Sequence, residues 1–146
     1  MIVSGDVRIE SIELTNAQLI ILAATPVEMI PAPGAGLVAV PLHMIVRFTR
    51  GTVAYSVNSN LRLEFVGSTT NLTQTLSIPF ADGGGASRDQ CLHVNRTLGL
   101  TFADDFNPSN RAIEVLLDAD INNGNASDLL RVSVLYEIVP SAALGY

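Results

Sequence analysis

Apolar and polar residues alternate along most of this chain, in short runs between positions 37 and 140 that are separated by Gly, Asn, Asp and Pro. A period of two is typical of a half-buried β-strand, because successive side chains point to opposite faces of the sheet. The alternation predicts strands over residues 7–9 (extending as far as 14), 37–49, 52–57, 61–66, 72–80, 91–95, 98–103, 112–118 and 130–139.

The longest of these segments, residues 37–49, contains a proline that restricts where the strand can lie. The alternation assigns one face to Val38, Val40, Leu42, Met44, Val46 and Phe48, and the other face to Ala39, His43 and Arg47. Pro41 has no N–H group to donate to a neighbouring strand. It therefore predicts a sheet edge or a β-bulge at this position.

One short helix is predicted near the N-terminus. Thr15 followed by Gln18 has the form of a capping box, in which the two residues satisfy the first free N–H groups of a helix. The apolar face of about two turns consists of Leu19, Ile20, Leu22 and Ala23. Pro26 ends the helix, because proline disfavours the helical conformation of the residue before it. Residues 25–33 are then expected to be extended, and residues 33–36 to form a turn.

The number of strands and the spacing of the turn residues predict a two-sheet sandwich or a barrel. An eight-stranded jelly roll fits both the strand count and the long connections. The predicted fold class is all-β, a jelly-roll-like antiparallel β-sandwich with one short N-terminal helix. At 146 residues the chain is expected to form one domain, residues 1–146, with flexible termini at residues 1–6 and 141–146.

The composition changes this picture in one respect. Hydrophobic residues make up 48% of the chain and charged residues only 15%, whereas soluble proteins average about 25% charged residues. This predicts that part of the outer surface is covered by further copies of the chain or by a partner. The alternative is a dense core beneath a surface of Ser, Thr and Asn.

Charge and the single cysteine exclude several classes of partner and compartment. The net charge of −6 argues against nucleic-acid binding, which needs a basic surface. No apolar run approaches the roughly 20 residues that span a bilayer, and no signal peptide is visible, so no membrane partner is expected. Cys91 cannot form an internal disulfide, which fits a reducing cytoplasm.

Candidate chemistry is sparse. Residues 118–124 place oxygen ligands at alternate positions, but they lack the glycine and glutamate of a calcium-binding EF-hand, so a turn is the better interpretation. Cys91, His93 and His43 offer fewer ligands than a zinc or cupin-like site requires. The sequence therefore predicts no catalytic residue, no metal, no cofactor and no enzymatic activity.

Two segments resemble parts of known phage proteins. Residues 24–41, ATPVEMIPAPGAGLVAVP, resemble a strand–turn–strand of small tailed-phage structural proteins, and the preceding helical turn at residues 16–23 fits the same pattern. Residues 112–117, 123–125 and 132–139 resemble the terminal β-hairpin of those proteins. The family is that of the jelly-roll cement, or decoration, proteins of phage capsids.

The resemblance implies a virion structural protein, made in the host cytoplasm, that binds the exterior of the phage head. Its implied partner is the major capsid protein, and its implied assembly is a small homo-oligomer, with a trimer favoured and a dimer possible. Such a protein would stabilise contacts between neighbouring capsid subunits by adding buried area at several joints at once. The family implies no catalytic residue.

The two ends of the chain are the predicted contact elements, since small and almost uncharged ends can extend across a neighbour. The candidate contacts there are Met1, Ile2, Val3, Leu144 and Tyr146. Frayed termini are the alternative interpretation of both ends.

The alternative function is a tail or fibre recognition module that binds a sugar or a receptor. It would use the loops over residues 81–90 and 103–111, with Arg88 and Arg111 as contacts. Three tyrosines and no tryptophan are a thin set of aromatic side chains for stacking against sugars.

Overall fold

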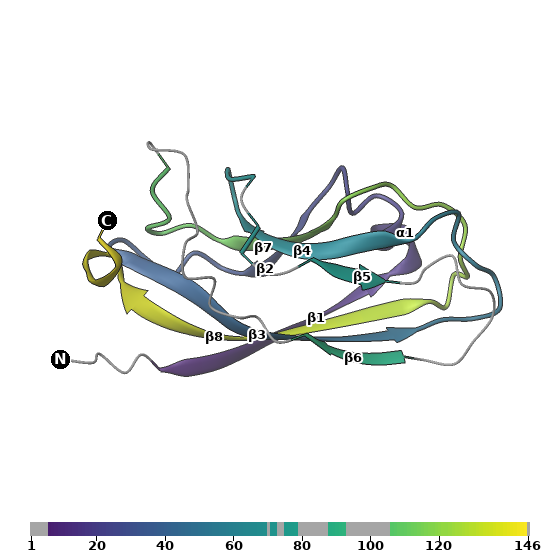
Figure 1. Cartoon of the computed structure of the whole chain (residues 1–146), viewed down its shortest axis with the longest axis horizontal. Coiled ribbons are helices and arrows are strands. Elements are labelled where there is room, and N and C mark those ends of the chain that lie inside the picture. Colours follow the sequence, from purple (N-terminus) through teal and green to yellow (C-terminus); the bar gives the residue numbers. More distant parts are fainter. Residues whose placement is uncertain (1–5, 70, 73–74, 79–87, 93–105, 146) are drawn as a thin grey trace.

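The computed structural model describes residues 6–69, 71–72, 75–78, 88–92 and 106–145, with the backbone path alone for residues 88–92. They form two four-stranded antiparallel sheets that pack face to face (Figure 1). Sheet A has the order β1-β8-β3-β6, and sheet B the order β2-β7-β4-β5. The strands are β1 (Val7–Thr15), β2 (Val27–Ile30), β3 (Leu37–Thr49), β4 (Ser59–Phe65), β5 (Leu76–Ile78), β6 (Arg88–Leu92), β7 (Ile113–Leu117) and β8 (Leu129–Pro140).

Most strands that follow one another along the chain lie in opposite sheets. The chain passes from β1 in sheet A to β2 in sheet B, returns to β3 in sheet A, and continues to cross in this way, apart from the β4–β5 step within sheet B. This connectivity defines a jelly roll. The predicted fold class, an all-β sandwich with one short N-terminal helix, is confirmed.

The core lies between the inner faces of the two sheets. On β8 the predicted alternation is confirmed, because Leu130, Val132, Val134 and Tyr136 are all buried. Opposite them, Leu61 and Leu63 of β4 are fully buried. Each such aliphatic side chain contributes about 1.5–3 kcal/mol when it leaves water, so these two strands supply much of the packing between the sheets.

Pro41 lies at a β-bulge, as its missing N–H group predicts. Pro41 pairs with Tyr136 and His43 with Leu135, so β3 carries one extra residue, Leu42. A bulge is the arrangement that lets proline occupy a central strand, because the ladder is already interrupted there.

The bulge also exchanges the two faces of β3. Before the bulge the odd-numbered Ala39 faces the core, and after it the even-numbered Met44 does. Val40 pairs with Glu137 and lies on the outer face. The prediction of one continuous apolar face from residue 38 to residue 48 is therefore wrong, since an added residue shifts the period of two by one step.

The helix α1 (Asn16–Leu19) begins as the capping box predicts. The Thr15 N–H group donates to Gln18 Oε1 at 3.0 Å, and the Thr15 hydroxyl lies 3.1 Å from the same oxygen. The helix has one turn and not two, because the N–H groups of Ile21 and Leu22 bond to carbonyls only three residues earlier. Two successive β-branched isoleucines, Ile20 and Ile21, lower the helix propensity at this point.

Two other predicted elements are wrong because the chain changes sheets. Residues 52–57 form no strand, since they belong to the crossing from β3 in sheet A to β4 in sheet B. Residues 112–139 form no hairpin, because β7 lies in sheet B and β8 in sheet A. The loop at residues 118–128 carries Asn123 and Gly124 with positive φ, as expected of a turn.

The segments around β5 and β6 agree only in part with the sequence prediction. Of the predicted strand 72–80, Leu76–Ile78 form β5, and residues 73–74 and 79–80 lie outside the described residues. The loop predicted over residues 81–90 is wrong at residues 88–90, which pair with β3 as the start of β6. The predicted strand 98–103 lies outside the described residues.

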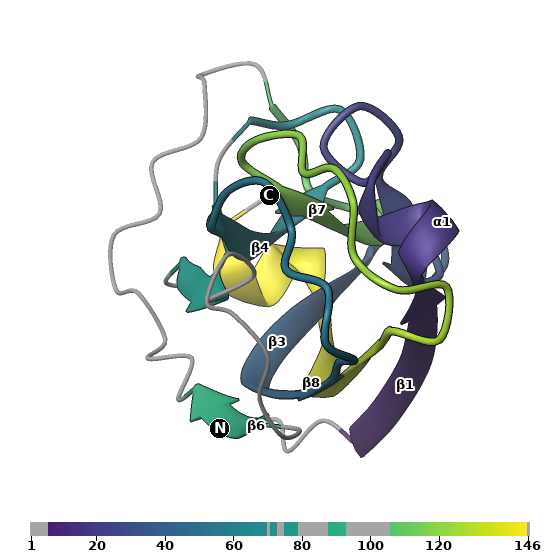
Figure 2. The ribbon, with the colours of Figure 1, turned by 90° about the vertical axis from the view of Figure 1, so that its right-hand side faces the viewer.

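Asp128 joins the two loops that cross between the sheets, β3–β4 and β7–β8. They lie at the α1 end of the sandwich, which faces the viewer in Figure 2. Asp128 is fully buried, and its carboxylate accepts hydrogen bonds from the N–H groups of Gly51 at 2.7 Å and Asn125 at 2.8 Å. Burial, the negative charge of Asp128 and a hydrogen bond to it raise the pKa of the Tyr55 hydroxyl far above its usual range. Tyr55 therefore stays protonated.

Candidate interaction surfaces

Figure 1 shows no described strand or helix packed over the middle of the outer face of sheet A, although its row Val139–Val38 is buried. Strand register arranges its side chains in rows across β1, β8 and β3, because directly paired residues share a face. From the end nearest the chain termini the rows are Val7–Glu137–Val40, Ile9–Leu135–His43, Ser11–Ser133–Ile45 and Glu13–Arg131–Arg47.

Apolar side chains predominate on the half of this face nearest the termini, where Glu137 and His43 are the polar members of the first two rows. Ile9 is 65% exposed, Val7 58% and Ile45 52%, and they surround the half-buried Leu135. A sheet with one face in the core normally presents polar side chains on the other. Exposed aliphatic side chains grouped over three neighbouring strands are typical of a surface that binds a partner.

The remaining positions of the same face, which begin beside Ile45 in its own row, are polar. The Ser11 and Ser133 hydroxyls share a hydrogen bond of 2.7 Å, and Arg131 forms an ion pair with Glu13, whose Oε1 lies 3.1 Å from the arginine Nε. Both charged side chains are about half exposed, so this pair adds little stability. It forms a hydrated border beside the apolar rows.

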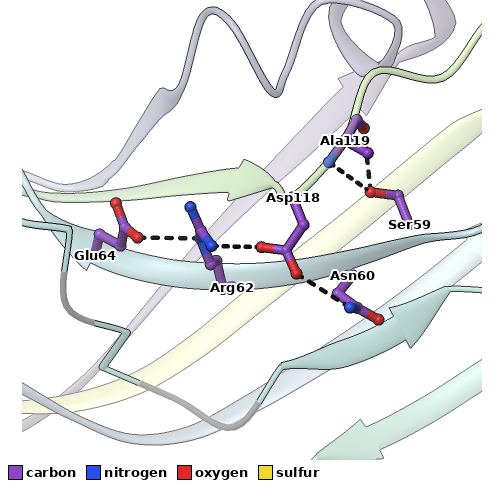
Figure 3. A network of polar contacts seen from close by, with 6 residues as sticks. All are labelled: Ser59, Asn60, Arg62, Glu64, Asp118 and Ala119. Atoms are coloured by element: carbon purple, nitrogen blue, oxygen red, sulfur yellow. Dashed lines mark hydrogen bonds and ion pairs between the residues drawn. The ribbon is translucent and has the colours of Figure 1, made fainter.

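Sheet B presents a different outer face, built around an arginine between two carboxylates (Figure 3). Arg62 Nε lies 3.0 Å from Glu64 Oε1, and Arg62 Nη1 lies 2.5 Å from Asp118 Oδ1. Asp118 also accepts a hydrogen bond of 3.0 Å from the Asn60 amide. The network joins β4 to the end of β7, since Asp118 directly follows that strand.

Glu64 is buried although it belongs to this outer face. It is 4% exposed, and strand register places it in a row with Glu114 and Glu28. Burial raises the pKa of Glu64; the Arg62 guanidinium opposes that shift, whereas the charges of Glu114 and Asp118 add to it. The native state therefore holds a proton on Glu64 more tightly than the unfolded chain does.

We expect the Glu64→Gln variant to show a flatter dependence of stability on pH. Because the native pKa of Glu64 is raised, its contribution favours folding most below the ordinary glutamate value and is lost as the pH rises through the raised value. Chemical denaturation from about pH 4 to about pH 8 measures this slope. The same substitution at exposed Glu28 is the control, and equal slopes in both variants would contradict the assignment.

The structure separates the two arginines that the sequence offered as contacts. Arg88 pairs with Phe48 at the far end of β3. Arg111 lies at the opposite end, where the preceding residue donates a backbone hydrogen bond of 2.8 Å to Leu37 at the start of β3. The guanidinium of Arg111 lies 5.6 Å from the centre of the Phe106 ring. The two arginines therefore do not belong to one loop cluster.

The predicted contact residues of the chain ends are only partly described. Leu144 is 47% exposed in the 3₁₀ helix η1 (Ser141–Leu144), which lies at the same end of the sandwich as Arg111. Ser141 is buried, and its N–H group donates to the Gly36 carbonyl at 2.8 Å. Met1, Ile2, Val3 and Tyr146 lie outside the described residues, so their role as contacts stays a prediction.

Within the described ranges, no group of three or more His, Cys, Asp or Glu side chains is arranged to hold a metal ion. His43 lies on the outer face of sheet A, the Cys91 backbone pairs with Ile45, and His93 lies outside those ranges. Tyr55 and Tyr136 are both buried, so neither is available to stack against a sugar. Neither helix of the described chain has the length and apolar character to cross a bilayer.

Sequence reasoning missed the apolar outer face of sheet A. The signal was present in Val7 and Ile9, which are apolar at the outward positions of β1. Only the register of β1 against β8, and of β8 against β3, brings these residues beside Leu135 and Ile45. A local pattern cannot supply that register.

The fold and this uncovered face define the chain as a jelly-roll sandwich with an exposed apolar sheet surface. No family model matches the chain, and no curated protein sequence matches it. A chain of the cyanophage Pam1 capsid asymmetric unit has a similar structure, with a TM-score of 0.50 and 17% identity over 91% of this chain and 85% of that chain. A chain of the Ralstonia phage GP4 capsid gives a TM-score of 0.48 and 17% identity over 92% and 86%. At this identity the likeness to the Pam1 chain shows the fold.

Proposed function

We propose that this chain is a non-enzymatic virion structural protein that binds the outside of a phage head and stabilises contacts between major capsid proteins. The observation that carries the proposal is the apolar half of the outer face of sheet A, centred on Ile9, Leu135 and Ile45. The jelly-roll likeness to a chain of the Pam1 capsid supports a capsid as the partner.

The proposed binding is purely associative. Burying one exposed aliphatic side chain contributes about 1.5–3 kcal/mol before the cost of association is subtracted. A few such side chains on one copy give modest affinity. An oligomer that contacts several capsid subunits at once multiplies that affinity, because each further contact forms at high effective concentration.

The copy number of the chain in purified virions tests the proposal, measured by quantitative mass spectrometry against the major capsid protein. Hundreds of copies, or a ratio near one to one, are expected of a cement protein. A handful of copies would overturn this role in favour of a tail or fibre recognition module. Absence from particles would overturn both.

We expect the Ile45→Glu variant to bind purified heads at least tenfold more weakly than the natural chain, since a charge would have to be buried against the partner. Ile45 is 52% exposed, so the variant should keep its melting temperature. Val57→Glu is the matched control, because Val57 is 43% exposed in the β3–β4 loop and lies off the sheet. Equal binding of the two variants would show that this face does not meet the head.

A further inference from the structure

β1 forms one edge of sheet A. Among the described residues its strand partner is β8, and its opposite side pairs with no strand. α1 follows directly after Thr15 and lies at that end of the strand, which leaves residues 7–11 as the open part of the edge (Figure 2). An open edge presents free backbone N–H and C=O groups that can pair with another extended chain.

The open part of β1 is also the place where apolar exposure is highest. Ile9 and Val7 are the two most exposed large hydrophobic side chains in the part of the chain that the structure describes. Both lie on the outer face of sheet A, directly at its edge. A neighbour that continues the sheet sideways would set its own side chains beside them on this face.

We propose that two copies of this chain pair through β1, antiparallel, with Ile9 of one copy directly opposite Ile9 of the second. The two sheets A then form one continuous eight-stranded sheet about a two-fold axis. This is strand addition at a sheet edge, in which backbone hydrogen bonds supply affinity and side chains set the register.

The charges of β1 select this register. A two-fold axis perpendicular to the sheet pairs residues of the same face, so it must lie midway between one residue and the same residue of the second copy. Centred on Ile9, the axis sets Arg8 of each copy opposite Glu10 of the other, which makes two complementary pairs. Centred on Arg8 or on Glu10, it sets like charges opposite each other, which destabilises a sheet.

The next register, centred on Ser11, is less favourable for two reasons. It sets Arg8 opposite Leu14 of the second copy and leaves Glu10 opposite Ile12, so neither charge meets a partner. It also requires residues 12–15, whose end of the strand lies beside α1. Pairing around Ile9 avoids α1.

The pairing joins the apolar rows of both copies into a single surface. Ile9 of one copy meets Ile9 of the other at the seam, with Leu135 and Ile45 on either side. The contact is isologous and closes on two copies, so it specifies the dimer and not the trimer that the family resemblance favours. It stands independently of the capsid proposal, since purified protein alone can test it.

The test is the mass of the purified protein by light scattering after gel filtration, and by native mass spectrometry. The natural chain is expected at twice 15.5 kDa. Arg8→Glu and Glu10→Arg each turn both complementary pairs into repulsive ones, so each variant should dissociate about tenfold more readily or further. An equimolar mixture of the two variants should recover a dimer, because every pair across the seam is then complementary again.

Glu28→Arg is the control, since it makes the same charge change as Glu10→Arg at an exposed position of sheet B. It should leave the dimer intact. A natural chain of one-copy or three-copy mass would overturn the proposal. So would single variants that remain dimers, or a mixture of the two that fails to associate although each keeps its melting temperature.

Discussion

Replacing Asp128 with alanine is expected to lower the free energy of unfolding by about 3–5 kcal/mol. The side chain is fully buried, and its removal leaves the N–H groups of Gly51 and Asn125 without their acceptor. It also removes the buried negative charge that acts on the Tyr55 hydroxyl. For a chain of this length, each kcal/mol corresponds to about 2–4 °C. Thermal melting and urea denaturation should both report the loss.

Two further variants distinguish the loss of the Asp128 hydrogen bonds from the general effect of removing a carboxylate. Asp128→Asn keeps one of the two acceptor oxygens and replaces the other with an NH2 group, so it should lose less stability than Asp128→Ala but still leave one backbone N–H group without an acceptor. Asp120→Ala removes an exposed carboxylate from the same loop and should change stability by about 0.5 kcal/mol at most. If Asp128→Ala loses no more stability than Asp120→Ala, the Asp128 hydrogen bonds do not hold the two crossing loops together.

The second large effect is expected for Gly124→Ala. Gly124 has a φ of +74°, and an added Cβ would lie 2.3 Å from Tyr55 Cζ. The left-handed conformation costs an alanine about 1–2 kcal/mol. Because the Tyr55 ring is buried and cannot move freely, the overpacking adds about 1–3 kcal/mol. The sum should lower the melting temperature by roughly 10 °C.

Gly36→Ala isolates the conformational part of that loss. Gly36 has nearly the same φ, +75°, but an added Cβ would meet no atom within 4 Å. Its alanine variant should therefore lose only the cost of the left-handed conformation. If the two glycine variants melt at the same temperature, the contact between the two crossing loops is looser than the structure shows.

These two predictions concern the end of the sandwich that holds the crossing loops, and the proposed binding surfaces lie elsewhere. Asp128 and Gly124 fix the loops that connect the two sheets, whereas Ile45 lies on the open face of sheet A and Ile9 at its edge. Loss of stability and loss of association should therefore be separable. A variant at Ile45 or Ile9 that also unfolds the protein would show that the outer face contributes to the core.

The strands themselves could be predicted because alternation is a local property. β3 begins and ends at the predicted residues, β8 extends the prediction by one residue at each end, and the alternating burial of β8 follows its sequence directly. Thr15 and Gln18 located the start of α1, since a capping box is complete within four residues. The sequence therefore determined an all-β chain with one short helix.

Only the tertiary structure decided which sheet each strand joins. The resemblance at residues 112–139 suggested a hairpin, but β7 pairs with β4 and β2, and β8 pairs with β1 and β3. Alternation shows that one face of a strand is buried, but it does not show against which strand. That choice depends on pairings between residues far apart in the sequence.

The same limit applies to the candidate surfaces. The sequence marked Val7 and Ile9 only as alternate residues of a short strand, and Arg62, Glu64 and Asp118 only as scattered charges. Register across the sheets grouped the first set with Ile45, and the β4–β7 pairing brought the second set into one network. The sequence by itself determined the strands and a deficit of charge. The long-range pairing of those strands decided where the uncovered apolar surface lies, because neighbours across a sheet are set by register and not by distance along the chain.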